Sequence, residues 1–411
     1  MTKFKLFLAF CIFLLASFIV LININNKKAE EKETQVVFWT VQLSPFSSYM
    51  QNVIKEFETK NPNIKIKWID IPYSEAEKRV LASLLSNNMP DLINITADFN
   101  TTLSTKGALL NIETGMENYS NEILKAVTYN NKTYGIPFYA TSAITIFNKD
   151  LVNEFNITTH PQTYIDLFNI INKSKQIKNK YLFMPTLTEN DTLYKILNKY
   201  NLASHSKINT QKSVEFFTQL AKLYNDEKIP KEAITQTHRE VLEKYSSGQI
   251  AYLQAGANFL NIIKENSLDI YEKTDITYQL YGTKKEYDFS LMTLAIPLKS
   301  QKQKEAILFA QFLTNEENQL EFAKLTGVLP CNKLALNNEY FKETQTNNLD
   351  KKARTVSAKQ LLNPISYPQQ TNKHKEILTL INKTTEQILL ENENPQTMLN
   401  TLSKNWKTLS K

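Results

Sequence analysis

Cysteine, glycine and histidine are scarce in this chain of 411 residues, which has two, seven and four of them. Cys11 lies in an apolar N-terminal stretch, so Cys331 has no partner for a disulfide in the folded part. The glycines are too few for a phosphate-binding loop, and no Gly-x-Ser-x-Gly elbow occurs. The four histidines lack the paired spacing of a zinc motif: His160, His205, His238 and His374. We therefore predict no enzyme, no metal, no cofactor and no catalytic residue; a glycosidase with two facing carboxylates stays an open alternative.

Runs of like charge are also missing. The formal net charge of +7 comes from lysines scattered among 41 acidic residues, so we expect no nucleic-acid partner. Hydrophobic residues make up 42% of the chain and aromatic residues 11%, which is typical of a packed globular protein. The length exceeds that of one ordinary domain and fits two lobes with an appendage.

One long apolar run lies at the N-terminus. Leu6–Ile22 contains 17 residues without a charge and would span roughly 26 Å as a helix, near the thickness of a bilayer core. Lys3 and Lys5 precede it and should stay in the cytoplasm, so the body from about Thr34 onward is predicted to be exported. No small-x-small cleavage site is evident, which favours an uncleaved anchor; a signal segment that is cleaved and releases the body is the alternative.

After this segment, strand and helix patterns alternate. Val36–Trp39 and Leu92–Ile95 are short apolar runs typical of buried strands, and Ile64–Trp68 alternates as a half-exposed strand. Ser74 and Glu77 have the spacing of a capping box at the start of a helix. Such alternation predicts an α/β protein with parallel sheets covered by helices.

The same pattern continues to the C-terminus. Ala143–Phe147, Ile250–Gln254 and Leu291–Ile296 are predicted strands. Helices are predicted near Glu376–Leu390 and Gln396–Leu409.

A series of short motifs gives this chain a family resemblance. In order, they are Val37–Thr40, Phe57–Ile64, Asn88–Leu92, Lys106–Leu110, Tyr134–Phe138, Ile146–Leu151, Ser247–Ala251, Ala295–Pro297 and Thr326–Pro330. From Val36 to the end, the chain resembles the extracellular solute-binding proteins of carbohydrate importers, which include maltose-binding and glycerol-phosphate-binding receptors. Each motif alone is weak, and their shared order carries the resemblance.

This resemblance implies a two-lobed periplasmic-binding-protein fold, with each lobe a mainly parallel sheet flanked by helices. The chain would cross between the lobes near Thr141, Asp288 and Leu329, with the ligand in the cleft between them. The expected segments are an anchor or signal with linker at 1–33, first-lobe segments at 34–141 and 289–328, a second-lobe segment at 142–288, and a second-lobe C-terminal helical part at 329–411. Closure about the hinge would bury the ligand and present the liganded form to a permease.

Residues just after the strands are the candidates for ligand binding, since clefts of such lobes lie at the carboxyl ends of strands. In the first lobe, Thr40 and Gln42 offer hydrogen bonds to hydroxyl groups. Trp39 either stacks on a sugar or packs in the core. Asp98 beside Phe99 pairs an acceptor with an aromatic face, although Asp98 could instead cap a helix.

Near the passages between the lobes, Tyr139, Thr141 and Ser142 are polar or amphipathic positions in an apolar run. Tyr287 could stack on a ligand or simply lie at the surface.

In the second lobe, Thr186 and Glu189 follow one predicted strand, whereas Gly256 and Asn258 follow another. The resemblance implies a tryptophan platform at the place of Asn258, and its absence favours a smaller or more polar ligand over a long oligosaccharide.

We therefore expect the substrate-binding component of an ABC transporter. It would act as a monomer that captures a sugar or sugar derivative in the cleft between its lobes and delivers it to permease subunits in the membrane. A membrane-tethered sensor or scaffold with the same fold is the alternative.

Overall fold

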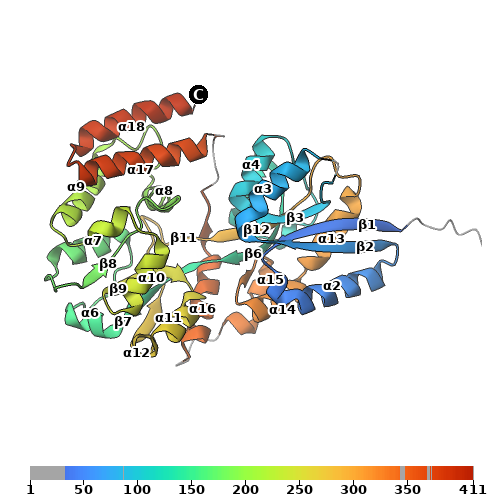
Figure 1. Cartoon of the computed structure of the whole chain (residues 1–411), viewed down its shortest axis with the longest axis horizontal. Helices are drawn as coiled ribbons and strands as arrows, with labels where there is room; N and C mark the ends of the chain where they lie inside the picture. The colour runs from blue at the N-terminus through green and yellow to red at the C-terminus, as the bar shows by residue number, and fades with distance from the viewer. Residues whose placement is uncertain (1–32, 87, 343–347, 368–370, 372, 411) are drawn as a thin grey trace, which may run out of the picture.

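The computed structural model describes residues 33–86, 88–342, 348–367, 371 and 373–410. These residues form two lobes that lie side by side, each with its own sheet and its own apolar core (Figure 1). The predicted N-terminal segment Leu6–Ile22 lies outside the described residues. Among the residues that are described, no helix combines the length and the apolar character that a membrane crossing requires.

The first lobe is built on a six-stranded sheet. In spatial order its strands are β13 (Leu329–Pro330), β6 (Ile136–Thr141), β12 (Ser290–Ala295), β3 (Leu92–Thr96), β1 (Thr34–Val41) and β2 (Ile64–Ile71). Its helices are α2 (Ser47–Lys60), α3 (Tyr73–Leu84), α4 (Ala97–Thr105), α5 (Asn121–Lys125), α13 (Gln303–Leu313), α14 (Glu316–Thr326) and α15 (Lys333–Leu336). Val36 and Phe38 alternate inward along β1 and join Met50 and Phe57 of α2 in one core.

The second lobe is built on a four-stranded sheet with the order β10 (Thr274–Thr277), β7 (Ala143–Asn148), β9 (Ile250–Gly256) and β8 (Tyr181–Phe183). Its helices are α6 (Lys149–Glu154), α7 (Tyr164–Lys173), α8 (Thr192–Lys199), α9 (Gln211–Asn225), α10 (His238–Ser246), α11 (Phe259–Asn266) and α12 (Leu268–Glu272). Two C-terminal helices, α17 (His374–Leu390) and α18 (Pro395–Leu409), complete this lobe, close to the predicted bounds. Ile381, Leu399 and Trp406 bury them in its core.

The sheets are mixed, so the prediction of mainly parallel sheets was wrong. β1 is parallel to β2 and β3, but β12 runs antiparallel to both β3 and β6. In the smaller sheet, β7 is antiparallel to β9 and β10, and only β8 and β9 run parallel. A strand that follows a passage from the opposite lobe enters its sheet from the cleft side. It therefore runs antiparallel to the neighbouring strands that lead toward the cleft.

The chain passes between the lobes at closely spaced points. Thr141 ends β6 and Ala143 begins β7, while β11 (Tyr287–Asp288) is followed directly by β12. β11 pairs with β14 (Pro364–Ile365) beside these passages. A further hairpin, of β4 (Thr128–Tyr129) and β5 (Lys132–Thr133), lies in the first lobe.

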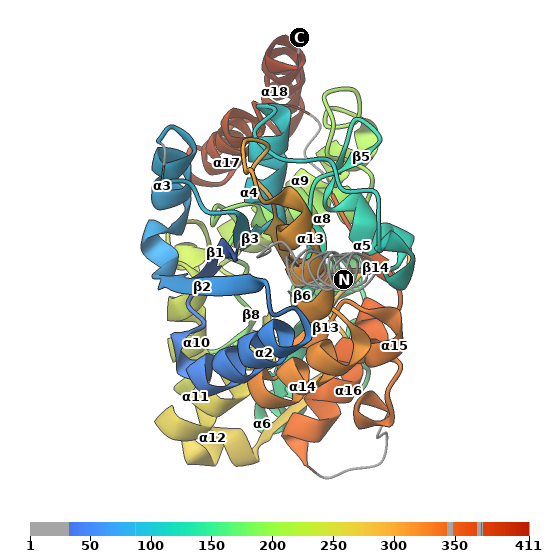
Figure 2. The same cartoon turned by 90° about the vertical axis from the view of Figure 1, so that its right-hand side faces the viewer.

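The third passage differs from the prediction. Leu329 pairs with Ala140 in the larger sheet, so the chain is still in the first lobe there. The passage lies instead at α16 (Leu349–Leu361), whose Ala353 packs in the second core and whose Leu361 packs in the first. Figure 2 shows α15 and α16 below the larger sheet and α17 above it. The other predicted segment boundaries stay predictions.

The helix after β2 begins earlier than the capping box predicted. Pro72 is the N-cap of α3, and no side chain caps this end of the helix. The proline ring fixes φ in a range that suits the start of a helix. Pro72 therefore directs the chain into the helix at Tyr73, and no side-chain cap from Ser74 is needed.

Candidate functional site

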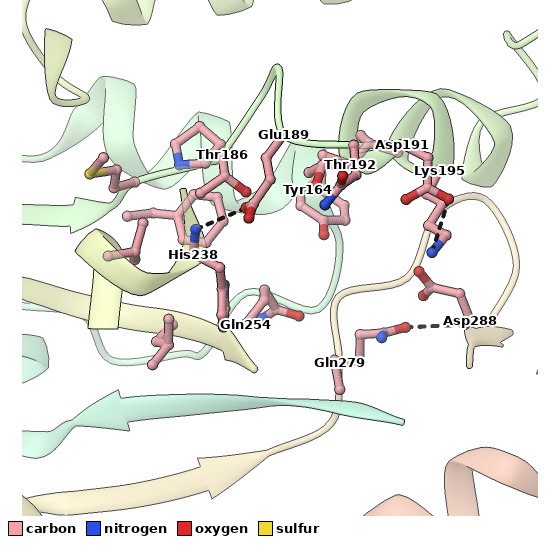
Figure 3. A pocket seen from close by; sticks show the side chains of 18 of the residues that line it. Tyr164, Thr186, Glu189, Asp191, Thr192, Lys195, His238, Gln254, Gln279 and Asp288 are labelled. Carbon is pink, nitrogen blue, oxygen red and sulfur yellow. Dashed lines mark hydrogen bonds and ion pairs between the residues drawn. The ribbon is translucent and has the colours of Figure 1, made fainter. Parts of the chain in front are cut away.

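A cavity of about 310 Å³ opens at the carboxyl ends of β8 and β9 in the second lobe (Figure 3). Most of its lining residues are polar, and they come from the β8–α8 loop, α8, α10 and the passages between the lobes. They include Thr186, Glu189, Asp191, Lys195, Lys199, His238, Gln254, Gln279 and Asp288. A cavity of this size, with converging polar side chains, is typical of a small-molecule site.

Glu189 is a fixed hydrogen-bond acceptor in this cavity. Its Oε2 accepts a hydrogen bond of 2.8 Å from the backbone N–H of His238, the first residue of α10 (Figure 3). The positive end of the helix dipole stabilises a carboxylate there. The remaining lone pairs of Glu189 can therefore accept hydrogen bonds from a ligand without rearrangement.

Charges on one face of α8 form ion pairs along the cavity. Lys195 lies four residues after Asp191, and its Nζ is 3.1 Å from the Asp191 carboxylate. Burial alone would lower the pKa of Lys195, but the carboxylates of Asp191 and Asp288 outweigh burial and raise it. Lys195 therefore carries a positive charge at neutral pH.

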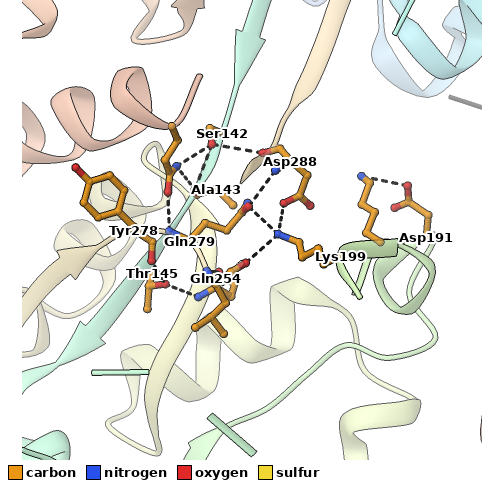
Figure 4. Close-up of polar contacts among 12 residues, drawn as sticks. Ser142, Ala143, Thr145, Asp191, Lys199, Gln254, Tyr278, Gln279 and Asp288 are labelled. Atoms are coloured by element: carbon orange, nitrogen blue, oxygen red, sulfur yellow. Dashed lines mark hydrogen bonds and ion pairs between the residues drawn. The ribbon is translucent and has the colours of Figure 1, made fainter. Parts of the chain in front are cut away.

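Lys199, one turn further along α8, is the centre of a buried polar network (Figure 4). Its Nζ donates to Asp288 Oδ1 at 2.5 Å, to Gln279 Oε1 at 2.9 Å and to the Leu280 carbonyl at 2.8 Å. These bonds use all three ammonium donors. Burial opposes ionisation of Asp288, but Lys199 and Lys195 outweigh burial and lower the pKa of its carboxyl. At Gly282, a Cβ would lie 2.0 Å from the Lys199 carbonyl oxygen, so glycine permits the close approach of this loop to α8.

Gln360 of α16 connects this network to the other passages. Its side-chain amide donates to Ser142 Oγ at 2.8 Å and to the Ala143 carbonyl at 2.7 Å. Its Oε1 accepts a bond of 2.6 Å from the Gln279 N–H. All three passages therefore meet in one hydrogen-bonded cluster, and Ala143, Gln279 and Asp288 of this cluster also line the cavity.

A second cavity, of about 230 Å³, opens at the carboxyl ends of β1 and β3 in the first lobe. Its lining is mostly apolar: Val41, Tyr73, Ser74, Ala76, Glu77, Ile95, Thr96, Phe99 and Met292. The two lobes thus offer one polar wall and one apolar wall.

Charged residues of the two lobes interact beside these cavities. Desolvation by the surrounding protein raises the pKa of the Asp98 carboxyl, although Asp98 is partly exposed, and Lys195 of the second lobe partly offsets this shift. Glu77 of α3 lies 4.0 Å from Lys375 of α17. Electrostatic interactions therefore cross the cleft between the lobes.

Several residues predicted from the sequence lie at these walls. Thr186 and Glu189 line the second-lobe cavity, and Phe99 lines that of the first lobe. Asp98 lies next to Phe99 in the first turn of α4. The helix is capped by Thr96, whose Oγ1 accepts from the Phe99 N–H, so the Asp98 carboxylate is not the cap.

Three predicted residues at the end of β1 lie apart from the cavities. Thr40 is buried, with Oγ1 donating to Asp70 and accepting from the Trp68 indole. Trp39 packs against the apolar clusters on the other face of β1. Gln42 is exposed, with a left-handed φ of 55°.

The predicted residues near the passages have mainly internal contacts. Tyr139 packs on Phe322, and Ser142 is held by Gln360. Tyr287 is buried and stacks on Tyr278, and burial raises its pKa to about 12.

The other predicted residues are Thr141, Gly256 and Asn258. Thr141 is exposed at the end of β6. Asn258 is also exposed, directly before α11, and Gly256 ends β9; neither lines the two cavities.

Sequence reasoning missed Lys195, Lys199, His238, Asp288 and Tyr73. The spacing of four between Asp191, Lys195 and Lys199 was a usable signal, because it places all three on one helix face. Nothing in the sequence indicates that Asp288 meets Lys199.

Comparison with known proteins agrees with this geometry. A sequence profile described as "Bacterial extracellular solute-binding protein" matches residues 52–348. The chain belongs to this family. A binding protein of Brucella abortus (strain 2308) is 23% identical to this solute-binding protein over 369 residues, covering 84% of this chain and 85% of the relative.

Solved structures show the same two-lobed fold. A protein assigned as an oligosaccharide periplasmic-binding protein from Synechococcus sp. MITs9220 superposes with a TM-score of 0.83 at 25% identity, covering 91% of this chain and 98% of that one. The maltose-binding protein MalE of Listeria monocytogenes, in complex with maltose, has a TM-score of 0.75 at 19% identity, covering 92% and 97%. The predicted two-lobed α/β fold is therefore confirmed. The family consists of extracellular binding proteins, so this solute-binding protein is exported.

Three histidines make the stability of this solute-binding protein depend on pH. Burial lowers the pKa values of His160, His238 and His374, so the unfolded chain binds more protons than the folded protein below about pH 6.5. We expect the free energy of unfolding, measured by urea titration, to fall between pH 7.5 and 5.5. His238→Asn should make this decrease smaller, and a stability that rises over the same interval would contradict the prediction.

Proposed function

We propose that this protein is the substrate-binding component of an ABC importer and that it captures a carbohydrate in the cleft between its lobes. The observation that carries the proposal is the pairing of a polar wall with an apolar wall across a cleft whose floor is the hinge. A pyranose ring has hydroxyl groups around its edge and C–H groups on its faces, so it needs both kinds of surface.

The polar wall suits hydroxyl groups. Glu189 supplies a fixed acceptor and Lys195 a charged donor. The Gln254 amide is held in place by Thr145 and the Leu280 N–H, and its second N–H remains for a ligand. Charged hydrogen-bonding groups strengthen such contacts in a closed cleft. The Synechococcus and Listeria proteins, named for binding an oligosaccharide and maltose, support a carbohydrate ligand by analogy.

Ligand binding would close the lobes about the cluster around Gln360. A ligand that contacts both walls binds the closed form better than the open form, and this difference in affinity shifts the equilibrium toward closure. The closed form would then dock on permease subunits as a monomer. We further propose that Leu6–Ile22 tethers the protein to the outer face of the membrane. The comparisons do not favour the alternative of a tethered sensor.

Thermal unfolding of the purified protein with a panel of ligands tests this function. The panel should include maltose, maltotetraose, a galactooligosaccharide, a sugar phosphate, an amino acid and a peptide. A ligand at a hundred times its dissociation constant stabilises the folded state by about 2.7 kcal/mol, enough to raise Tm by several degrees. A saturable shift with a saccharide supports the proposal. A shift with the amino acid or peptide alone would overturn the carbohydrate assignment.

A further inference from the structure

Tyr73 is a large aromatic side chain that remains 64% exposed on the first lobe. It is the first residue of α3, and Pro72 before it fixes the direction in which the helix starts. An exposed aromatic ring gains free energy when a ligand covers it. The position of the Tyr73 ring relative to the cleft therefore decides whether a bound ligand can contact it.

The ring lies at the rim of the first-lobe cavity. Val41, Phe99 and Met292 line the same cavity, so the surface beside Tyr73 is apolar. Glu77, one turn further along α3, also lines it and lies 4.0 Å from Lys375 of the second lobe. This face of α3 is thus directed at the opposite lobe.

The second lobe presents mainly polar groups to this apolar surface. Tyr164 and Phe183 line its cavity, but both rings are buried, and Lys199 Nζ lies 5.9 Å from the centre of the Tyr164 ring. Asn258, which ends the loop after β9, is exposed and lies outside the cavity. Among the Tyr and Phe rings that line the two described cavities, Tyr73 is therefore the exposed one, because Phe99 is buried as well.

We infer that Tyr73 is a specificity-determining residue on which one pyranose ring of the ligand stacks. This inference rests on the proposed function. The C–H face of the sugar would lie against the Tyr73 ring, with its hydroxyl edge directed toward Glu189 and Lys195. Closure of the lobes would cover the exposed ring, so stacking would contribute more in the closed form than in the open form. Saccharides with a C–H-rich face would be preferred over acyclic polyols of similar hydroxyl content.

Isothermal titration with maltose, maltotetraose, a galactooligosaccharide and sorbitol tests this role in the wild-type protein and three variants. Tyr73→Ser should weaken saccharide binding roughly tenfold, the upper range for an aromatic contact, whereas Tyr73→Trp should bind at least as tightly as wild type. Leu85→Ser is the matched control, because Leu85 caps the same helix, is 92% exposed and does not line the cavity. It should bind as wild type does.

Ligand NMR separates stacking from an indirect structural effect. The ring current of Tyr73 should shift ligand C–H protons upfield in the wild type, and this shift should be absent in Tyr73→Ser. Wild-type affinity in Tyr73→Ser, or an unchanged proton shift, would overturn the inference while leaving the proposed function intact. If no saccharide binds the wild-type protein, the proposed function and the inference both fail.

Discussion

Replacing Lys199 by methionine is expected to lower the free energy of unfolding by about 3–5 kcal/mol. The Lys199 side chain is 2% exposed and Asp288 is 18% exposed, so the variant leaves the Asp288 carboxylate in the hinge without its main cation. Gln279 Oε1 and the Leu280 carbonyl also lose a donor. Urea titration at pH 7 measures the loss.

A control variant and a pH titration test whether the loss of stability comes from the buried ion pair. Lys222→Met removes a surface ion pair with Asp226 and should cost no more than about 1 kcal/mol. The pKa of the Asp288 carboxyl is lower in the folded protein than in the unfolded chain. The ion pair therefore stabilises the folded protein fully at pH values above the pKa of Asp288 in the unfolded chain. This stabilisation is lost as the pH falls through the pKa of Asp288 in the folded protein. The difference between wild type and Lys199→Met should therefore narrow below about pH 4. Equal losses for the two lysines would show that the buried pair has no special role.

Replacing Glu189 by glutamine should weaken saccharide binding tenfold or more, since a hydrogen bond to a charged group contributes about 1.5–3 kcal/mol. The variant removes the negative charge that α10 stabilises. Its amide oxygen can still accept from the His238 N–H, but its NH₂ group then presents a donor to the ligand where the carboxylate presents an acceptor. Isothermal titration with the saccharide that gives the largest thermal shift measures the effect.

Glu243→Gln is the matched control for this prediction. Glu243 lies on α10, whose first N–H group donates to Glu189, and its side chain is 66% exposed and faces Arg239. It should leave affinity unchanged. If both variants bind within twofold of wild type, Glu189 is not a ligand contact and the site must lie elsewhere in the cleft.

The sequence predicted the strands well because buried strands are continuous apolar runs. Ala143–Phe147 corresponds to β7, Ala143–Asn148, and Leu92–Ile95 corresponds to β3, Leu92–Thr96. Strand direction was harder, because it depends on the lobe from which the chain returns. β12 is antiparallel for this reason, and no local pattern in residues 290–295 records it.

Residues of the candidate site were predicted only where one short stretch of the sequence supplies several of its side chains. Thr186 and Glu189 share the loop after β8, so the rule of strand ends located them. The same rule selected Thr40, but its side chain points to the face of β1 where Asp70 and Trp68 take its hydrogen bonds. Lys199 and Asp288 are 89 residues apart and meet only through folding of the whole lobe.

The place of β12 in the larger sheet also constrains when the chain can fold. β12 lies between β6 and β3, so the centre of the first lobe is open until residues 290–295 are available. A nascent chain that lacks them cannot complete this core, because its central contacts join residues about two hundred positions apart. The topology therefore places completion of the first-lobe core late in the synthesis of the chain, after most of the second-lobe segments have been made.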